Sequence, residues 1–383
     1  MQSTASSEKI PLWVDCDTGH DDAYALLLAA YHPRAQLLGV STVHGNAALK
    51  QTTFNTRAIL EAIGRRDVKV YTGAAKPMYR DAVHAADIHG ESGLDGVTLL
   101  PQPVEQAVEE EDCLEAMYKA LIATPPNTAY LVSTGTLTNI GQLFLKYPDL
   151  AAHLKGLSIM GGAIGGGFTN APMGKVEGEG ERFGNWTAYA EFNIYCDPEA
   201  SASILNNKVL NPKTTLVTLD LSHQVLATAP VRQQLLYSSA KTNSASGTTS
   251  ALRALFWQIL TFFAKTYAEV FSLTAGPPLH DPLAVAAILE PAFFPNPDGE
   301  RFHVDVVTEG VHSMDQAKVG QLGRTVATKL PKGEAGVSIP RNVEVDKFWA
   351  LIEECLQKAD KVTPLPQLSP EDLRANGVSE ESA

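Results

Sequence analysis

The chain has 383 residues, of which 44% are hydrophobic and 19% are charged, a composition typical of a globular protein with a large core. Its net charge of -13 argues against nucleic acid or an anionic membrane as the main partner. No apolar run reaches the roughly 18–20 residues of a membrane span, and the first residues lack the layout of a signal peptide. Four widely spaced cysteines predict free thiols, so we expect a cytoplasmic protein: Cys16, Cys113, Cys196 and Cys355.

Short apolar runs alternate with helical patterns along most of the chain. We expect strands at Leu12–Asp15, Gln36–Val43, Val68–Thr72, Ala129–Ser133, Leu157–Met160 and Thr215–Leu219. We expect helices between them, at Ala23–Tyr31, Thr52–Ile63, Cys113–Ala123 and Pro198–Asn206. Near-continuous apolar strands that alternate with helices predict an α/β fold with an open, mostly parallel, Rossmann-like central sheet covered by helices on both faces.

The domain prediction is a single domain over residues 10–362, with flexible termini at 1–9 and 364–383. A small C-terminal β-hairpin is expected from Phe302–Thr308 and Thr325–Thr328, followed by a helix over Val345–Lys358. The glycine-rich segment 163–184 predicts a mobile loop. The Ser/Thr/Gly-rich segment 238–250 predicts a flexible joint before a long helix.

An acidic cluster follows the first expected strand: Asp15, Asp17, Asp21 and Asp22 lie within eight residues. Carboxylates this close raise one another's pKa, and burial adds to that effect. A hard divalent cation with oxygen ligands resolves the conflict, so the cluster predicts a metal site. Helix capping is a simpler explanation for Asp21 and Asp22, but it leaves Asp15 and Asp17 unexplained.

Two other acidic motifs fit less well. An EF-hand loop would need a glycine at position 20 and a bidentate glutamate at position 26, where the chain has His20 and Leu26. A haloacid-dehalogenase-type phosphohydrolase also begins Asp-x-Asp, but its threonine would stand at Gly19. That second alternative stays open as a weaker one.

Other polar motifs follow the ends of expected strands, where ligands bind in an open parallel sheet. Asn46 and Thr134 follow two of the strands directly. Glu191 and Asn193 alternate with an apolar residue, which would place both on one face of an extended segment. His280 and Asp281, next to each other, form a pair suited to acid–base work and metal ligation.

In this order these motifs resemble the inosine/uridine-preferring nucleoside hydrolases, the nucleoside N-ribohydrolases. The match begins with Asp-Cys-Asp-Thr-Gly-His-Asp-Asp-Ala at 15–23 and covers roughly residues 10–360. It continues through Thr-Val-His-Gly-Asn (42–46), His-Gly-Glu-Ser-Gly (89–93), Thr-Gly-Thr-Leu-Thr-Asn (134–139), Met-Gly-Gly (160–162), Glu-Phe-Asn (191–193), Asp-Pro-Glu (197–199) and His-Asp-Pro (280–282).

The resemblance implies a Ca²⁺ ion held by Asp17, Asp22, the backbone carbonyl of Thr134 and Asp281. It implies that Asp17 is the general base and that His280 protonates or contacts the leaving base. It implies a substrate-binding set made of Asp21, Asn46, Met160, Asn185, Glu191, Asn193, His89 and Tyr267. Tyr267 lies on the expected long helix with Phe263 and Phe271, and these rings could stack on a nucleobase or simply pack in the core.

The resulting hypothesis is a Ca²⁺-dependent enzyme of nucleoside salvage that splits purine or pyrimidine ribonucleosides, such as inosine or uridine, into base and ribose. Family members form homodimers or homotetramers, so we expect a homo-oligomer. The alternative from another class is a non-catalytic nucleoside- or ribose-binding protein on the same scaffold. The sequence does not choose among nucleobases, because the 163–184 and 238–250 segments enter the regions that surround the substrate.

Overall fold

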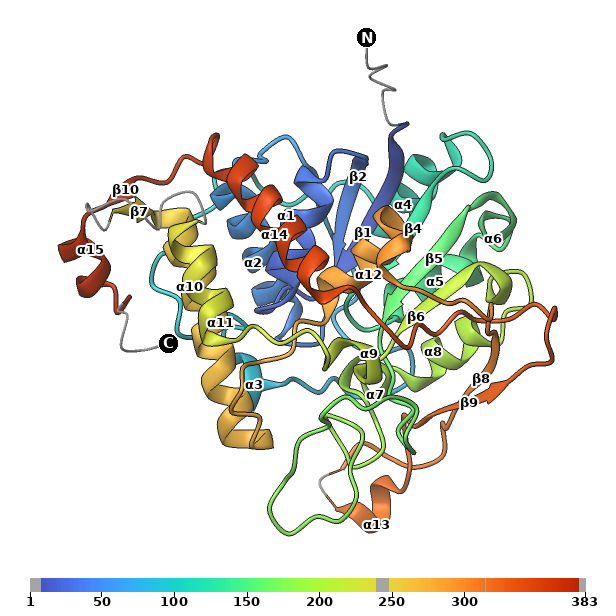
Figure 1. The fold of residues 1–383 in the computed structure, drawn as a ribbon. Coiled ribbons are helices and arrows are strands. Elements are labelled where there is room, and N and C mark those ends of the chain that lie inside the picture. The colour runs from blue at the N-terminus through green and yellow to red at the C-terminus, as the bar shows by residue number, and fades with distance from the viewer. Residues whose placement is uncertain (1–7, 239–247, 314, 379–383) are drawn as a thin grey trace.

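The computed structural model describes residues 8–238, 248–313 and 315–378. Its centre is a six-stranded sheet in the order β3-β2-β1-β4-β5-β6, in which every neighbouring pair is parallel (Figure 1). The strands are β1 Ile10–Cys16, β2 Ala35–Thr42, β3 Val70–Thr72, β4 Tyr130–Ser133, β5 Gly156–Met160 and β6 Thr214–Val217. The predicted α/β class and the six predicted strands are confirmed, with ends that differ by a few residues.

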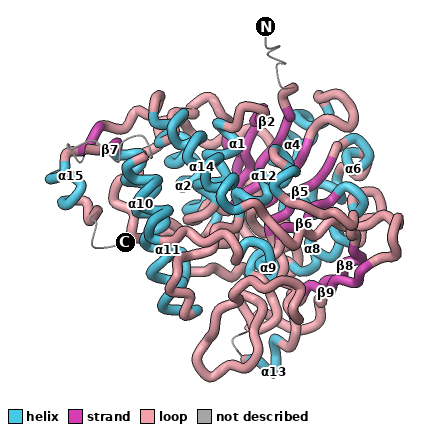
Figure 2. The backbone as a smooth tube through the Cα atoms, viewed as in Figure 1, coloured by secondary structure: helices cyan, strands magenta, loops and turns pink. Residues whose placement is uncertain are grey.

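Helices cover both faces of this sheet because its strands are apolar on both sides (Figure 2). In β1, Leu12 and Val14 enter one core cluster, whereas Trp13 enters the cluster on the other face. The first face is covered by α1 Asp22–Tyr31, α2 Leu49–Ala62, α11 Ala251–Phe271, α12 Asp281–Leu289 and α14 Val345–Asp360. The second face is covered by α4 Cys113–Ile122, α5 Thr138–Lys146, α6 Leu150–His153 and α8 Pro198–Leu205.

The predicted hairpin is confirmed as an antiparallel pair, β8 Phe302–Val306 with β9 Thr325–Lys329. The remaining elements are short, apart from α10. They are α3 Ala86–His89, α7 Phe192–Cys196, α9 Leu219–Ser222, α10 Ala229–Tyr237, α13 Gln316–Val319, α15 Pro370–Ala375, and 3-10 turns at Asn211–Lys213 and Pro291–Phe293. The four cysteines are free, as predicted, and all four are buried. Within the described ranges, no helix combines the length and the apolar character that a membrane crossing requires.

The C-terminal tail departs from the expectation of a flexible end. Residues 367–368 form β10, which pairs antiparallel with β7 Thr249–Ser250. Helix α15 follows with a capping box between Ser369 and Asp372, and Leu373 and Val378 are buried against Trp257. The prediction was wrong over 364–378 because a few apolar residues in a polar stretch suffice to anchor it. Residues 379–383, 1–7 and the 239–247 part of the predicted joint lie outside the described residues.

Candidate active site

The candidate site lies at the carboxyl edge of the sheet, between β1 and β4. The strand order reverses direction at this pair, and such a switch point leaves a crevice where ligands bind in doubly wound sheets. Asp17 follows β1 and Thr134 follows β4. Asp22 and Asp281 are the first residues of α1 and α12, two helices that pack together. The fold thus brings the first and last predicted metal ligands, 264 residues apart in sequence, to one place.

Three of the acidic side chains form a tight cluster. Asp21, Asp22 and Asp281 each offer a carboxylate oxygen, and these atoms all lie within 4.8 Å of one another. Burial, and then the charge of neighbouring aspartates, raises the pKa of Asp281 well above its usual range and that of Asp21 to about 7. Among the described residues, no lysine or arginine forms an ion pair with this cluster. An all-oxygen donor set without a protein cation fits a hard metal ion.

Asp17 lies directly beside this cluster and is held by Asn46. The backbone N–H of Asn46 donates to Asp17 Oδ2 at 2.8 Å, and its side-chain amide donates to both Asp17 Oδ1 and Asp22 Oδ2. A side chain at Gly45, whose φ is +156°, would lie 1.9 Å from Asp17 Oδ2. Burial, followed by the charge of Asp22, raises the pKa of Asp17 well above its usual range. Asn46 therefore ties the predicted base to a predicted ligand.

Asp22 and Thr134 are linked to each other. The Thr134 hydroxyl donates to Asp22 Oδ1 at 2.9 Å, and the Gly19 N–H donates to Asp22 Oδ2 at 2.8 Å. The Thr134 carbonyl, which the resemblance assigns to the metal, accepts from Asn193 Nδ2 at 2.9 Å. A carbonyl oxygen has a second lone pair, so this bond leaves it able to act as a ligand.

Asp15 points away from the cluster. Its Oδ1 accepts from the Ser41 hydroxyl at 2.5 Å and from Asn139 Nδ2 at 2.7 Å, and burial raises its pKa to about 7. These partners lie within and beside the sheet, so Asp15 fixes the end of β1 to its neighbours. The four clustered carboxylates thus divide into one structural group and three at the site.

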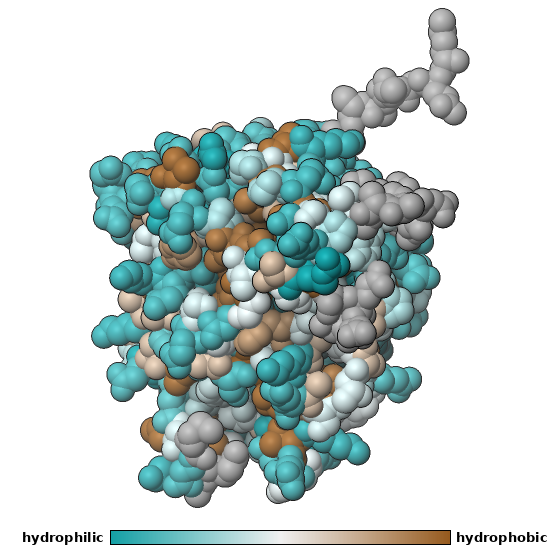
Figure 3. Space-filling model, turned by 90° about the vertical axis from the view of Figure 1, so that its left-hand side faces the viewer, coloured by the Kyte–Doolittle hydropathy of each residue, from teal (hydrophilic) through white to brown (hydrophobic). Residues whose placement is uncertain are grey.

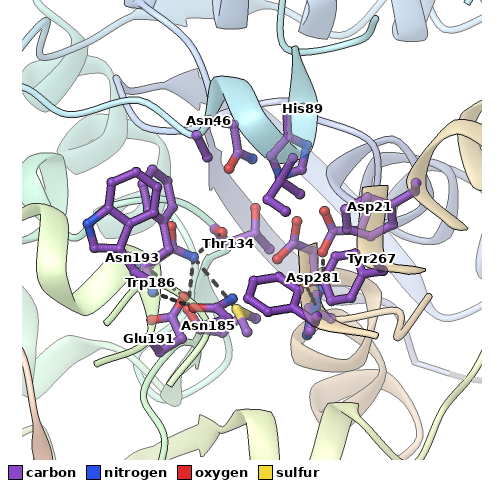
Figure 4. Close-up of a pocket in the computed structure, with 17 residues that line it drawn as sticks. Asp21, Asn46, His89, Thr134, Asn185, Trp186, Glu191, Asn193, Tyr267 and Asp281 are labelled. Carbon is purple, nitrogen blue, oxygen red and sulfur yellow. Dashed lines mark hydrogen bonds between the residues drawn. The ribbon is translucent and has the colours of Figure 1, made fainter. Parts of the chain in front are cut away.

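A pocket opens above these groups (Figure 4). Trp186 and Glu191 lie on one side of it, and Asp21 and Tyr267 on the other. It encloses about 40 Å³, space for about three water molecules. All the predicted substrate-binding residues line it, together with Thr134 and both residues of the His280–Asp281 pair: Asp21, Asn46, His89, Met160, Asn185, Glu191, Asn193 and Tyr267. Asp17 and Asp22 lie behind that lining.

The Glu191 segment differs from the predicted extended strand. Glu191 is the N-cap of α7, and its carboxylate accepts from the backbone N–H groups of Asn193, Ile194 and Gly162 at 2.8–3.0 Å. Because the Glu191 carboxylate accepts from the free backbone N–H groups of the first turn, the helix begins here. Burial raises the pKa of Glu191. Asn193 Oδ1 is buried and has no partner, which leaves it available to a ligand hydroxyl.

His280 is bonded at both ring nitrogens. Its Nδ1 lies 2.7 Å from the Ser222 hydroxyl, and its Nε2 lies 2.8 Å from the Tyr267 hydroxyl. Burial lowers its pKa well below the usual range, so the ring is neutral at pH 7. His89 is similarly buried, with its Nδ1 3.1 Å from His20 Nδ1. Both histidines therefore face the pocket as uncharged groups.

Several residues of the pocket wall carry no motif that indicates this location. Phe263 and Phe271, given above as either base-stacking or core residues, are both buried and line the pocket. Ala85, Ile88, Trp186 and Phe192 complete the wall and were not predicted. Trp186 follows the glycine-rich segment, which contains no helix or strand. A lone tryptophan in a segment without periodicity gives no sign of where it packs.

Comparisons with known proteins identify the family of this chain. The family model described as inosine-uridine preferring nucleoside hydrolase matches residues 12–350. The uridine nucleosidase of Saccharomyces cerevisiae is 35% identical over 360 residues, 93% of this chain and 98% of that protein. The inosine-uridine preferring nucleoside hydrolase of Crithidia fasciculata is 32% identical, over 90% of this chain and 96% of that one.

Solved structures show the same fold. The purine-preferring ribonucleoside hydrolase from Gardnerella vaginalis superposes with a TM-score of 0.74 at 24% identity, over 92% of this chain and 100% of that chain. The match of the family model spans both ends of the site, from the acidic cluster after β1 to the first residue of α12. The chain therefore belongs to the inosine-uridine preferring nucleoside hydrolase family, and it is a hydrolase of N-glycosyl bonds.

Proposed function

We propose that this enzyme cleaves the N-glycosidic bond of ribonucleosides, purine or pyrimidine, to free base and ribose, and that it depends on Ca²⁺. The observation that carries the proposal is the buried acidic cluster without a protein cation, next to a pocket lined by amide and carboxylate groups. We further propose that it acts in the cytoplasm as a homodimer or homotetramer.

The metal would be held by Asp17, Asp22, Asp281 and the Thr134 carbonyl. Two of these, Asp22 and Asp281, belong to the cluster within 4.8 Å, and Asp17 is joined to Asp22 through Asn46. Oxygen ligands of this kind suit Ca²⁺ better than a soft transition metal. When bound, Ca²⁺ would supply a positive charge that orients the sugar hydroxyls and acidifies a water molecule.

The protein's own groups would act on a sugar that becomes positively charged. Cleavage of an N-ribosidic bond passes through an oxocarbenium-like state, which nearby carboxylates stabilise. Asp21 and Asp281 line the pocket, so their charges lie close to that sugar. Asp17, positioned by Asn46, would accept the proton of the attacking water.

The sugar hydroxyls would be bound by polar atoms on the wall. Asn193 Oδ1 is a buried acceptor without a partner, and Asn46 also lines the pocket. An unpaired buried acceptor costs about 1–3 kcal/mol, which a ribose hydroxyl would recover. Asn185 and Trp186, beside the irregular 163–184 segment, also belong to this wall.

The leaving base would meet Tyr267 and His280. Because His280 is neutral and bonded to the Tyr267 hydroxyl, a proton could pass to the base through that hydroxyl. His280→Ala should then slow purine nucleosides more than aryl ribosides whose leaving group needs no proton. Equal losses on both substrate classes would mean that His280 only positions the substrate.

The direct test is ribose release from inosine, adenosine, guanosine, uridine and cytidine, with and without a Ca²⁺ chelator. We expect release from at least one nucleoside, loss on chelation and recovery with added Ca²⁺. Tight binding of a nucleoside without ribose release would instead identify a binding protein. Phosphate release from a generic phosphoester, with a preference for Mg²⁺, would identify a phosphohydrolase.

A further inference from the structure

A second cavity lies on the face formed by α10, α11 and α15, away from the catalytic pocket. It encloses about 660 Å³ and is bounded by α10, α11, the loop at 96–98 and the end of α15. Figure 3 faces this side of the molecule and shows apolar side chains gathered between hydrophilic ones. Its volume is within the range of small-molecule sites, about 300–1,000 Å³. Its lining combines apolar with a few polar residues: Gly96, Thr98, Arg232, Trp257, Gln258, Thr261, Phe262, Ala264, Lys265, Ala375, Asn376 and Gly377.

Arg232 is the unusual member of this lining. Arg232 is only 6% exposed. Its Nη1 donates to the Ala227 carbonyl oxygen at 2.7 Å. Its Nε is buried and has no partner. In the part of the chain that the structure describes, no carboxylate forms an ion pair with it. A buried charge without a counter-charge is costly, so an anionic ligand beside Arg232 would be favourable.

Two more buried donors in the same lining lack partners. They are the indole Nε1 of Trp257 and the hydroxyl of Thr261. By contrast, Gln258 in the same wall is fully used, since its amide donates to Thr98 Oγ1 and to the Asn376 carbonyl. Buried polar groups are nearly always paired, so three unpaired donors among the residues that line one cavity are unusual. The exposed Lys265 adds a second cation at this cavity.

We propose that this cavity binds a small organic anion, with a carboxylate or phosphate group on a flat apolar body. Arg232, with the Thr261 hydroxyl, would take the oxyanion, because guanidinium groups bind carboxylate and phosphate oxygens strongly. Trp257 and Phe262 supply apolar surface for the rest of the ligand. This second ligand site goes beyond the proposed function. Its charged side chains are positive, whereas those of the catalytic pocket are carboxylates.

The two sites are separated by one aromatic layer. Phe262 lines the cavity and stacks on His20, with ring centroids 5.0 Å apart and ring planes 9° apart. His20 in turn contacts His89 and Phe263, which both line the catalytic pocket. An anion in the cavity is therefore not a substrate reaching the catalytic centre, and its binding can be measured independently of turnover.

The test is calorimetric titration of the Ca²⁺-loaded protein with benzoate and with phenyl phosphate, at constant ionic strength in chloride. We expect saturable binding of one molecule per chain to at least one probe, and the preferred probe identifies the carboxylate or the phosphate source. Arg232→Gln should weaken binding about tenfold or more, and Lys265→Gln a few-fold. The matched surface variants Arg66→Gln and Lys347→Gln should bind as the wild type does.

A second measurement covers the case in which Arg232→Gln fails to fold. The intrinsic fluorescence of the wild type should change with the same saturation curve, and Trp257→Phe should remove that change. Thr261→Val should also weaken calorimetric binding. Absence of saturable binding for both probes would overturn the proposal, as would unchanged affinity in Lys265→Gln and Thr261→Val together.

Discussion

Two clusters of buried charge in this protein have opposite designs. In the first, Arg253 on α11 bonds Glu353 with two nitrogens and Asp360 with a third, each at 3.1 Å. In the second, Asp21, Asp22 and Asp281 converge without any cation from the described protein. In the first cluster the chain itself supplies a cation for its carboxylates, and this contact joins α11 to α14. The second has no cation of its own, so its carboxyl groups either hold protons, as their raised pKa values indicate, or bind a cation, and a buried cluster of one sign therefore indicates a binding site.

The largest effect on turnover should come from Asp17, which lies beside the acidic cluster. Asp17→Asn removes the proposed base but keeps a side chain that Asn46 can hold, so turnover should fall by about 10²–10⁴-fold. Ribose binding, followed by calorimetry, should stay measurable. Asp15→Asn is the control, since Asp15 bonds Ser41 and Asn139 instead of the cluster. Near-normal rates in Asp17→Asn would refute the general-base assignment.

The Arg253 cluster should respond in the free energy of unfolding instead. Arg253→Met leaves Glu353 buried without its partner, which should cost about 3–5 kcal/mol in the free energy of unfolding. Urea denaturation measures this loss. Arg66→Met, which breaks the partly exposed pair with Glu61, should cost no more than about 1 kcal/mol. If both variants lost the same amount, burial would not be what makes the Arg253 cluster important.

Ca²⁺ should stabilise the protein through the acidic cluster alone. At a concentration one hundred times the dissociation constant, binding to the folded state adds about 2.7 kcal/mol. Thermal unfolding in chelator and in Ca²⁺ should therefore differ for the wild type and agree for Asp22→Asn. The exposed-site variant Asp149→Asn should behave like the wild type. An identical midpoint with and without Ca²⁺ in the wild type would show that the cluster binds no Ca²⁺.

The buried His44 is a third case, in which burial keeps a single titratable side chain uncharged. Burial lowers the pKa of His44 to about 3, below its ordinary value near 6.5. Because the unfolded chain binds the proton more readily, His44 stabilises the fold above pH 6.5 and loses that contribution as the pH falls toward 3. Between pH 6 and 4, the wild type should lose about 1 kcal/mol per pH unit more than His44→Gln.

The half-exposed His303 provides the control for this measurement. Urea unfolding of His303→Gln, measured over the same pH range, shows what replacing a histidine outside the core does by itself. A His44→Gln variant that followed the pH dependence of the wild type would mean that His44 does not titrate as its burial indicates.

The sequence predicted the framework better than the wall of the site. Central strands such as β1 are apolar on both faces, so their positions are evident before the fold is known. The acidic cluster is likewise evident because its members are adjacent in the chain. Trp186 could not be placed, because its neighbours in the pocket come from distant segments and its own segment has no periodicity.

Two predictions were wrong because a local hydrogen bond decided the structure. Glu191 was expected in an extended segment, but its carboxylate caps α7. The tail was expected to be flexible, although Ser369 and Asp372 form a capping box whose sequence pattern is visible in advance. In both segments the amino-acid composition favoured irregular or extended chain, whereas one or two capping side chains started a helix.

The pairing of β10 with β7 has a consequence for how substrate choice can change. Ala251, the first residue of α11, donates its N–H to the Pro366 carbonyl at 2.8 Å, and Ser250 beside it pairs with Gln367. The same helix ends with the rings of Tyr267 and Phe271 in the catalytic pocket. One continuous helix therefore links the pairing at residues 366–368 to the wall of the catalytic pocket. Substitutions at 366–368, outside the pocket lining, should for that reason change the position of these two rings.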